Sequence, residues 1–244
     1  MWDNASLLAR IANFLLGLSA LAILYGTVHY IVHLPALLPV KTVRLANTPE
    51  RISDAVVLEV VRRGVQGNFL TVNIEKLRVA LQAVPWVKSV SISRQFPDSL
   101  VLKIEEHQPV ARWNDDALVD KQGEVFVAET SMQLPRFIGI DGSSAEVLDE
   151  YGKFSEQLAV LNLKVSQIVF SARHAWQLGL SNGTVVELGR EALQERVERF
   201  VAYRKSMDDA AKMGDGKQKA EGQEVVDMRY RHGFAVRVIG KAEG

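Results

Sequence analysis

A long apolar segment near the N-terminus constrains this chain more than any other feature. Residues 11–34, IANFLLGLSALAILYGTVHYIVHL, contain no Asp, Glu, Lys or Arg. At a rise of about 1.5 Å per residue, about 20 helical residues cross the hydrocarbon layer of a bilayer. We therefore expect an uncleaved transmembrane helix over residues 11–34, preceded by a tail of residues 1–10. A cleaved signal peptide is the main alternative, but its apolar region is shorter, about 7 to 15 residues.

The charges that flank this segment leave its orientation open. Arg10 is the only basic side chain before it and Asp3 opposes that charge, whereas Lys41 and Arg44 follow on the other side. Basic residues favour the cytoplasmic side of a span. The two orientations are therefore nearly tied on charge alone.

Composition excludes several functional classes. The 244 residues, 48% of them hydrophobic, are enough for one or two domains besides the span. The formal net charge is +0, so the chain lacks the basic character expected of a nucleic-acid-binding protein. There are no cysteines, which excludes disulfides, thiolate metal sites and cysteine nucleophiles.

A first extramembrane domain is predicted after Pro35 and Pro39, because proline ends a helix. Apolar and polar residues alternate in three segments, which predicts strands at 40–46, 87–94 and 100–106. Between the first two strands, apolar stripes predict two helices, one capped by Ser53 and the other starting after Asn73. The predicted order is β-α-α-β-β.

The rest of the chain predicts a second domain of mixed helices and strands. Ser143 and Glu146 match a capping box that would open a helix through about Leu161. A second amphipathic helix is expected from about Arg190 to Met207, followed by a polar, mobile loop over 208–223. The predicted strands are 118–127, 134–140, 165–170, 176–180 and 184–188, with a turn at Ser181-Asn182-Gly183 and two closing strands around His232-Gly233.

A search for catalytic residues finds no convincing constellation. His107, His174 and His232 have no evident ligand or nucleophile partner, so we expect them on the surface or in strands. The doublet Glu105-Glu106 places its side chains on opposite strand faces, as does Asp115-Asp116, so neither is an acid/base pair by spacing. No serine lies in a G-x-S-x-G elbow. The sequence therefore favours an interaction protein over an enzyme, although an unfamiliar enzyme is not excluded.

The last predicted strand is a candidate partner surface. A strand near the chain end can form a sheet edge, whose unpaired N–H and C=O groups accept an added strand. Tyr230 could anchor such a contact, and Arg229, Arg231 and Arg237 could pair with acidic side chains. If the segment is one strand, its alternation predicts one charged and one apolar face. The alternative, a half-buried core tyrosine with solvating arginines, is equally compatible with the sequence.

Five segments in order resemble the FtsQ/DivIB family of bacterial cell-division proteins. They are GNFLTVNIEKLR at 67–78, the stretch from Val84 to Trp113, VDKQGEVF at 119–126, LGREALQERVERF at 188–200 and VDMRYRHGFAVRV at 226–238. The sequence departs from the family pattern in two places: LANTPERIS at 45–53 replaces a usual Gly-Asn turn, and the N-terminal tail is short and weakly basic. The resemblance covers nearly the whole chain.

The resemblance implies an α+β architecture with four parts. These are a cytoplasmic tail (1–10), a transmembrane helix (11–34), a POTRA domain (40–110) and a C-terminal β domain with a mainly antiparallel sheet (111–240). It also implies a single-pass inner-membrane protein at the division septum, with its bulk in the periplasm. Its expected role is a non-enzymatic scaffold of the divisome that links early division proteins to septal peptidoglycan synthesis, without cofactor or metal.

The resemblance also implies partners and contact residues. FtsB and FtsL are the expected partners of the C-terminal segment, with FtsK, FtsW, FtsI and FtsN as further components. By this resemblance, the residues expected to contact FtsB are Arg190, Arg229, Tyr230, Gly233, Phe234 and Val236. The last two POTRA strands are expected to receive FtsK through Ser89, Ile92 and Arg94.

Two other functional classes remain as alternatives. A POTRA-type chaperone or translocation module would bind unfolded polypeptides by strand addition, but such proteins usually carry a transmembrane β-barrel, and no run of barrel strands of about 10 residues is present. A cell-wall hydrolase would require a metal or carboxylate site that the sequence does not reveal.

Overall fold

The structure is a computed structural model that describes residues 5–32, 34, 38–212, 222–231 and 233–240. The chain divides into two compact units, Met1–Glu106 and His107–Gly244. The division lies four residues before the expected boundary between 110 and 111. The reason is that Pro109–Trp113, which was not predicted as a strand, forms β4 and pairs with β5 of the second unit.

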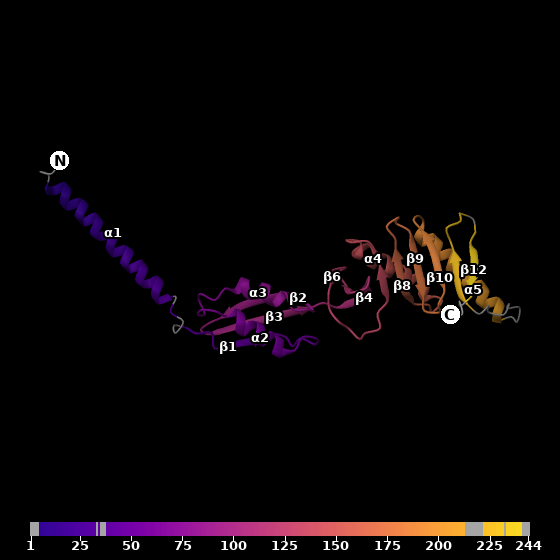
Figure 1. The fold of residues 1–244 in the computed structure, drawn as a ribbon, viewed down its shortest axis with the longest axis horizontal. Coiled ribbons are helices and arrows are strands. Elements are labelled where there is room, and N and C mark those ends of the chain that lie inside the picture. Colours follow the sequence, from indigo (N-terminus) through magenta and orange to yellow (C-terminus); the bar gives the residue numbers. More distant parts are fainter. Residues whose placement is uncertain (1–4, 33, 35–37, 213–221, 232, 241–244) are drawn as a thin grey trace. The chain divides into compact units, whose positions relative to one another are not determined.

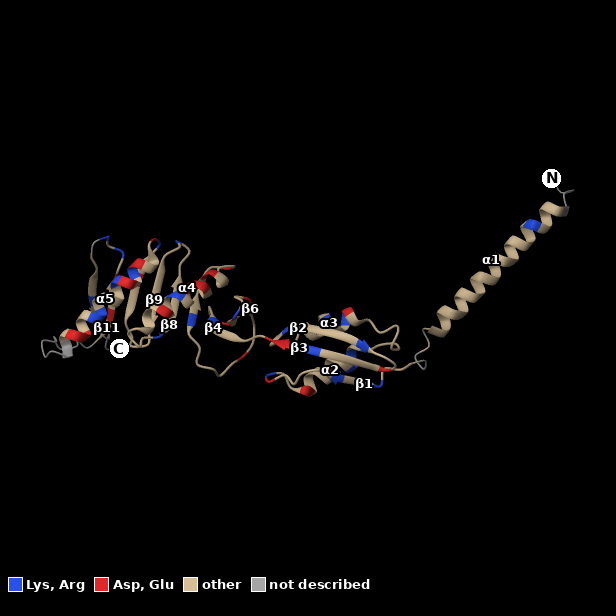
Figure 2. Ribbon diagram, turned by 180° about the vertical axis from the view of Figure 1, so that it is seen from behind, with Lys and Arg blue, Asp and Glu red and all other residues tan. Residues whose placement is uncertain are grey.

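The N-terminal helix α1, Ala5–Val32, is 28 residues long and drawn in indigo in Figure 1. It begins before the expected residue 11 because Ala5 to Ala9 favour helix and the single charge of Arg10 does not interrupt one. Ser6–Val32 is long and apolar enough to cross a membrane, and the side chains of its most apolar window are not buried by the protein. Figure 2 shows this helix almost free of charged residues.

The POTRA unit has the predicted β-α-α-β-β order. Its elements are β1 (Thr42–Leu45), α2 (Asp54–Gly64), α3 (Ile74–Gln82), β2 (Val87–Gln95) and β3 (Ser99–Glu106). Both predicted caps are confirmed: Ser53 Oγ accepts from the Ala55 N–H, and Asn73 Oδ1 accepts from the Lys76 N–H at 2.9 Å. These side chains satisfy N–H groups that a helix start leaves without partners.

The POTRA sheet has the strand order β1-β3-β2. β3 pairs with β1 in parallel and with β2 antiparallel, so β2 is a free edge in the part of the chain that the structure describes. The helices α2 and α3 bury Val57, Val61, Leu77 and Leu81 against it. The segment 45–53, which differs from the family pattern, is held against the sheet because the Asn47 side-chain amide hydrogen-bonds to the backbone N–H and C=O of Ile104 in β3.

The second unit contains one nine-stranded sheet with the order β12-β11-β10-β9-β8-β7-β4-β5-β6. Five of its neighbouring pairs are antiparallel and three are parallel, which confirms the predicted mixed and mainly antiparallel sheet. The strands not yet named are β5 (Ala117–Asp120), β6 (Val125–Phe126), β7 (Arg136–Ile138), β8 (Val165–Phe170), β9 (Trp176–Leu180), β10 (Val185–Gly189), β11 (Gln223–Asp227) and β12 (Ala235–Ile239).

Two of the three parallel pairs are joined by a helix. α4 (Ser144–Ala159) joins β7 to β8, and α5 (Leu193–Lys212) joins β10 to β11. A parallel pair needs such a crossover connection. Both helices lie against the sheet (Figure 1) and contribute Phe154, Leu158, Val197 and Phe200 to one buried cluster. The core of this unit therefore lies between the sheet and α4 and α5.

Three predicted local features differ from the structure. Ser143 precedes α4, but its Oγ donates to the carbonyl of Ile140 and makes no cap, so the predicted capping box is wrong. α5 begins at Leu193, so Arg190 lies in the turn before the helix. The predicted loop 208–223 is helical up to Lys212 and its last residue belongs to β11, while 213–221 lie outside the described residues, as does His232.

Candidate partner-binding site

The strand β12 forms one edge of the large sheet. It pairs only with β11 among the described residues, in an antiparallel register that places Val236 opposite Val226. All five residues of β12 are exposed, including Val236, Val238 and Ile239 at 42%, 45% and 52%. This confirms the expected sheet edge, and no described residue buries its apolar side chains.

Tyr230 and its neighbours lie in a connection and not in a strand. β11 ends at Asp227 and β12 begins at Ala235, so the predicted alternation of Arg229, Tyr230 and Arg231 along one strand is wrong. The chain must reverse here for the two strands to pair antiparallel. Tyr230 is 57% exposed, which excludes the alternative of a half-buried core tyrosine.

Arg229 is held in place by two acidic side chains of its own unit. Its Nε and Nη2 donate to the Asp227 carboxylate at 2.8 and 2.6 Å, and its Nη2 lies 2.9 Å from Glu187 Oε2. The hydrogen bonds from Arg229 hold the pKa of Asp227 below its ordinary value. The same bonds raise the pKa of Arg229, so its guanidinium is both permanently charged and fixed in direction.

A second arginine donates hydrogen bonds to the backbone of the connection between β11 and β12. Arg199 in α5 donates from Nη1 to the carbonyls of Tyr230 and Arg231, at 3.2 and 3.1 Å, and from Nη2 to the carbonyl of Met228 at 3.3 Å. Nearby, the ring of Tyr203 lies 4.3 Å from that of Phe234. α5 thus positions the backbone at Tyr230. The sequence did not indicate this contact because it joins segments about thirty residues apart.

The fold brings Arg190 and Arg229 to the same surface hollow, which has a volume of about 410 Å³. Arg173 and Arg196 also line it, and neither was singled out in the sequence. Gly189, which also lines the hollow, has a φ of +74°, and a Cβ there would lie 2.9 Å from Arg196 Nη1. Glycine at 189 therefore permits both the backbone turn and the approach of the arginines.

The remaining carried-over residues lie at the same edge. Gly233 and Phe234 precede β12, Phe234 is 42% exposed, and Val236 lies within the strand. The structure therefore gathers five of the six FtsB-type residues on the segment 229–236 and places the sixth, Arg190, beside Arg229 in the hollow.

The three predicted POTRA contact residues do not share one surface. Ile92 packs against the buried cluster of the unit, and Arg94 Nη2 donates to the carbonyl of Val72 at 2.9 Å. Ser89 differs from them in parity along β2 and so lies on the other face of the strand. Its Oγ donates to Glu105 Oε2 at 2.9 Å. What the three have in common is their strand, β2, which is one of the two edges of the POTRA sheet in the described part of the chain.

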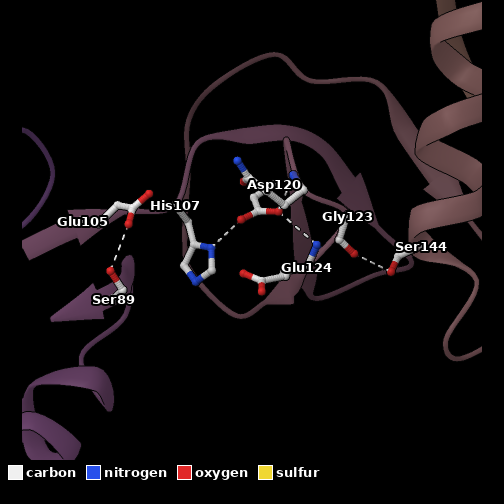
Figure 3. Close-up of polar contacts among 8 residues, drawn as sticks. Ser89, Glu105, His107, Asp120, Gly123, Glu124 and Ser144 are labelled. Carbon is white, nitrogen blue, oxygen red and sulfur yellow. Dashed lines mark hydrogen bonds and ion pairs between the residues drawn. The ribbon is translucent and has the colours of Figure 1, made fainter.

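His107 is buried, at 9% exposed, which corrects the expectation that it lies on the surface or in a strand. Figure 3 shows its ring facing the carboxylate of Asp120, with Nδ1 and Oδ2 2.9 Å apart. Asp120 Oδ1 also accepts from the N–H groups of Gln122 and Glu124. The ring stacks on Phe126 with centroids 4.2 Å apart.

Among the described residues, the only His and carboxylate group with metal-ligand spacing is His107, Asp120 and Glu124, whose ligand atoms lie within 4.8 Å of one another. Asp120 already accepts three hydrogen bonds from His107 and two turn N–H groups. The contact between His107 and Asp120 therefore joins the hairpin of β5 and β6 to the segment before β4.

Comparisons with known proteins agree with this architecture. Residues 38–107 match the family model of the FtsQ-type POTRA domain, and residues 111–229 match that of the C-terminal region of cell division protein FtsQ/DivIB. The chain belongs to the FtsQ/DivIB family.

Relatives in this family match along almost the whole chain. Cell division protein FtsQ of Nitrosospira multiformis is 37% identical over 97% of this chain and 99% of its own length. The proteins of the same name from Burkholderia pseudomallei and Neisseria gonorrhoeae are each 34% identical, over 98% and 97% of this chain and 95% of their own lengths. Family membership supports a role in cell division and, with α1, a membrane-anchored protein.

Proposed function

We propose that this protein is a non-enzymatic scaffold of the divisome that captures FtsB, in complex with FtsL, by strand addition to β12. The observation that carries the proposal is that β12 is a sheet edge with every residue exposed. A partner strand on this edge would take up its unpaired backbone groups, while side-chain contacts set the specificity.

The side chains beside this edge suit an acidic and amphipathic partner segment. Tyr230 offers a large apolar surface with a polar tip, and its backbone is already held by Arg199. Arg229 is fixed by Asp227 and Glu187, so little freedom is lost when a partner carboxylate approaches. Arg190 extends the positive charge along the hollow.

The proposed placement follows the family resemblance. Residues 1–10 would lie in the cytoplasm and both extramembrane domains in the periplasm, at the division septum. There the protein would connect early components such as FtsK to FtsW, FtsI and FtsN, which build septal peptidoglycan. Binding alone suffices for this role.

The test is binding of the fragment 38–244 to the periplasmic parts of FtsB and FtsL, measured by calorimetry. Tyr230→Ala should weaken binding by about 30-fold or more, because truncating an interface anchor costs about 2 kcal/mol or more. Val236→Lys should also weaken it, since a charged side chain protects an edge from strand addition. Arg190→Glu tests the hollow independently.

The matched control is Val127→Ala, an exposed apolar side chain that follows β6 at the opposite end of the same sheet. It should bind FtsB and FtsL as the parent does. Circular dichroism must show that every variant is folded. If Tyr230→Ala and Val236→Lys bind as tightly as the parent, the β12 site is wrong.

A second binding surface is supported by the free edge β2 of the POTRA sheet. We propose that it receives FtsK, with Ser89, Ile92 and Arg94 as strand contacts. The same edge would serve the alternative function of a POTRA-type polypeptide-binding module. Crosslinking from position 91, an exposed residue of β2, would distinguish one dominant partner from a mixture of unfolded chains.

A further inference from the structure

One end of the POTRA unit combines exposed apolar and basic residues, and we call it the POTRA tip. It comprises residues 38–41, 62–72 and 94–98, which backbone contacts hold together. The Phe69 N–H donates to the Leu38 carbonyl at 2.8 Å, and the Lys41 N–H donates to the Asp98 carbonyl at 2.9 Å. The end of β2 joins them through Arg94, which donates to the Val72 carbonyl.

The POTRA tip is the end of the unit that must lie close to the membrane. Leu38 follows the last residue of α1, Val32, by six positions, which an extended chain spans in at most about 22 Å. The buried amide of Asn68 donates to the carbonyls of Val32 and Leu34, at 2.5 and 3.1 Å. β3 runs from the tip to Glu106, so the two ends of the unit are separated by about 26 Å.

The apolar side chains of the tip are unusually open to solvent. Phe96 is 77% exposed, more than any other large apolar side chain that the structure describes. Leu70 is 52% exposed, and the Phe96 ring stands edge-on to that of Phe69 at 6.3 Å. Pro39 and Pro97 are exposed beside them. Exposed apolar side chains that are gathered on one surface mark a contact site for a protein or a membrane.

The charges of the tip are mainly positive. Its basic residues are Lys41, Arg62, Arg63 and Arg94. Its only acidic residue, Asp98, lies 3.8 Å from Lys41, and Arg63 pairs with Glu59 of the preceding helical turn. Arg62 and Arg63 lie in the last turn of α2, which runs from the Glu106 end of the unit toward the tip. Basic side chains close to a bilayer are attracted to anionic headgroups, and apolar side chains beside them enter the headgroup region.

We propose that the POTRA tip docks on the lipid surface from which α1 emerges, with Phe96 and Leu70 inserted among the headgroups and the four basic residues facing lipid phosphates. The membrane is favoured over a protein partner because α1 already anchors the tip within a short distance of it. Docking would restrict the tilt and rotation of the POTRA unit, so that its free β2 edge is presented in a defined direction.

The absence of cysteine makes a direct test possible, since one introduced cysteine can be labelled in the full chain. The single-cysteine variants Phe96→Cys and Leu70→Cys are labelled with a bimane fluorophore and placed in nanodiscs of phosphatidylethanolamine and phosphatidylglycerol. Quenching by lipids that bear a nitroxide near the headgroup reports insertion, and quenching by aqueous iodide reports exposure. We expect severalfold stronger lipid quenching at 96 and 70 than at two control positions, and weaker iodide quenching.

The controls are Val56→Cys, at the other end of α2, and Val127→Cys in the second unit, both exposed. A further variant, Phe96→Asp, should reduce lipid quenching of a label at 70 while leaving the circular dichroism unchanged. Labels at 96 and 70 that are as open to iodide as the controls would overturn the proposal. Protection from both lipid and iodide would also overturn it, because it would indicate a protein partner at the tip.

Discussion

The buried carboxylate of Asp120 provides the sharpest test of how the second unit is held together. It is fully buried and accepts hydrogen bonds from His107 Nδ1, the Gln122 N–H and the Glu124 N–H, each at 2.9 Å. We consider the substitution Asp120→Ala, which removes all three. Two of the donors belong to a turn between exposed residues, where water can replace the acceptor, whereas His107 is buried.

The expected loss of stability follows from these environments. A hydrogen bond to a charged group contributes about 1.5 to 3 kcal/mol, and a buried donor left without an acceptor costs about 1 to 3 kcal/mol. Counting the loss at the buried His107 donor as about 1 to 3 kcal/mol and each turn N–H as about 1 kcal/mol, Asp120→Ala should destabilise the unit by about 3 to 5 kcal/mol. Asp120→Asn keeps one acceptor oxygen for the turn, so about 1 to 2 kcal/mol is expected.

The assay is urea unfolding of fragment 38–244 in a Trp86→Phe background, where Trp113 and Trp176 report on the second unit. Asp115→Asn is the control, because that carboxylate is 80% exposed and its pair with Arg136 should contribute little. If Asp120→Ala unfolds at the same urea concentration as Asp115→Asn, the reasoning about the buried pair is refuted.

Three further predictions concern the partner-binding edge. Gly189→Ala should destabilise the fold by about 1 to 2 kcal/mol in thermal unfolding, since its φ is +74° and the new Cβ would press on Arg196; an unchanged Tm would contradict this. Arg199→Ala should speed amide exchange at Tyr230 and weaken FtsB binding while Arg199→Lys restores part of both, whereas unaltered exchange would show that the turn needs no support. Arg229 lowers the pKa of Asp227 below its ordinary value of 3.8. The ion pair of Asp227 and Arg229 should therefore contribute fully to the free energy of unfolding above pH 3.8 and progressively less as the pH falls below that value. Urea unfolding of Arg229→Gln beside the parent should therefore show a stability gap at neutral pH that narrows in acid, and a gap independent of pH would refute the assignment.

Local sequence signals predicted most elements of the fold. The order β-α-α-β-β, the caps at Ser53 and Asn73, and the strands from 165 to 188 all follow from short-range periodicity and turn chemistry, and the structure confirms them. The capping box at Ser143 failed because its hydroxyl found a nearer acceptor at Ile140. The helix expected from Arg190 begins at Leu193 because the chain first turns at Gly189 and Ala192, both with positive φ.

The candidate site was only partly visible in the sequence. Tyr230, Arg229 and two closing strands around His232-Gly233 were recognised, but Tyr230 and its neighbours were expected within a strand, whereas β11 ends at Asp227 and β12 begins at Ala235. Arg173, Arg196 and Arg199 were missed, and Arg199 reaches the site through contacts with a segment about thirty residues away in the sequence. Such contacts depend on which strands become neighbours in the sheet.

The sequence by itself determined the apolar helix, the two extramembrane units and the family, because those depend on hydrophobic length, short-range periodicity and the order of motifs. Only the tertiary structure decided that β12 is an edge, that His107 is buried against Asp120, and that Arg229 is fixed by Glu187 as well as Asp227. The physical reason is that exposure and electrostatic partners are set by long-range strand pairing, which brings together residues that carry no local signal of one another.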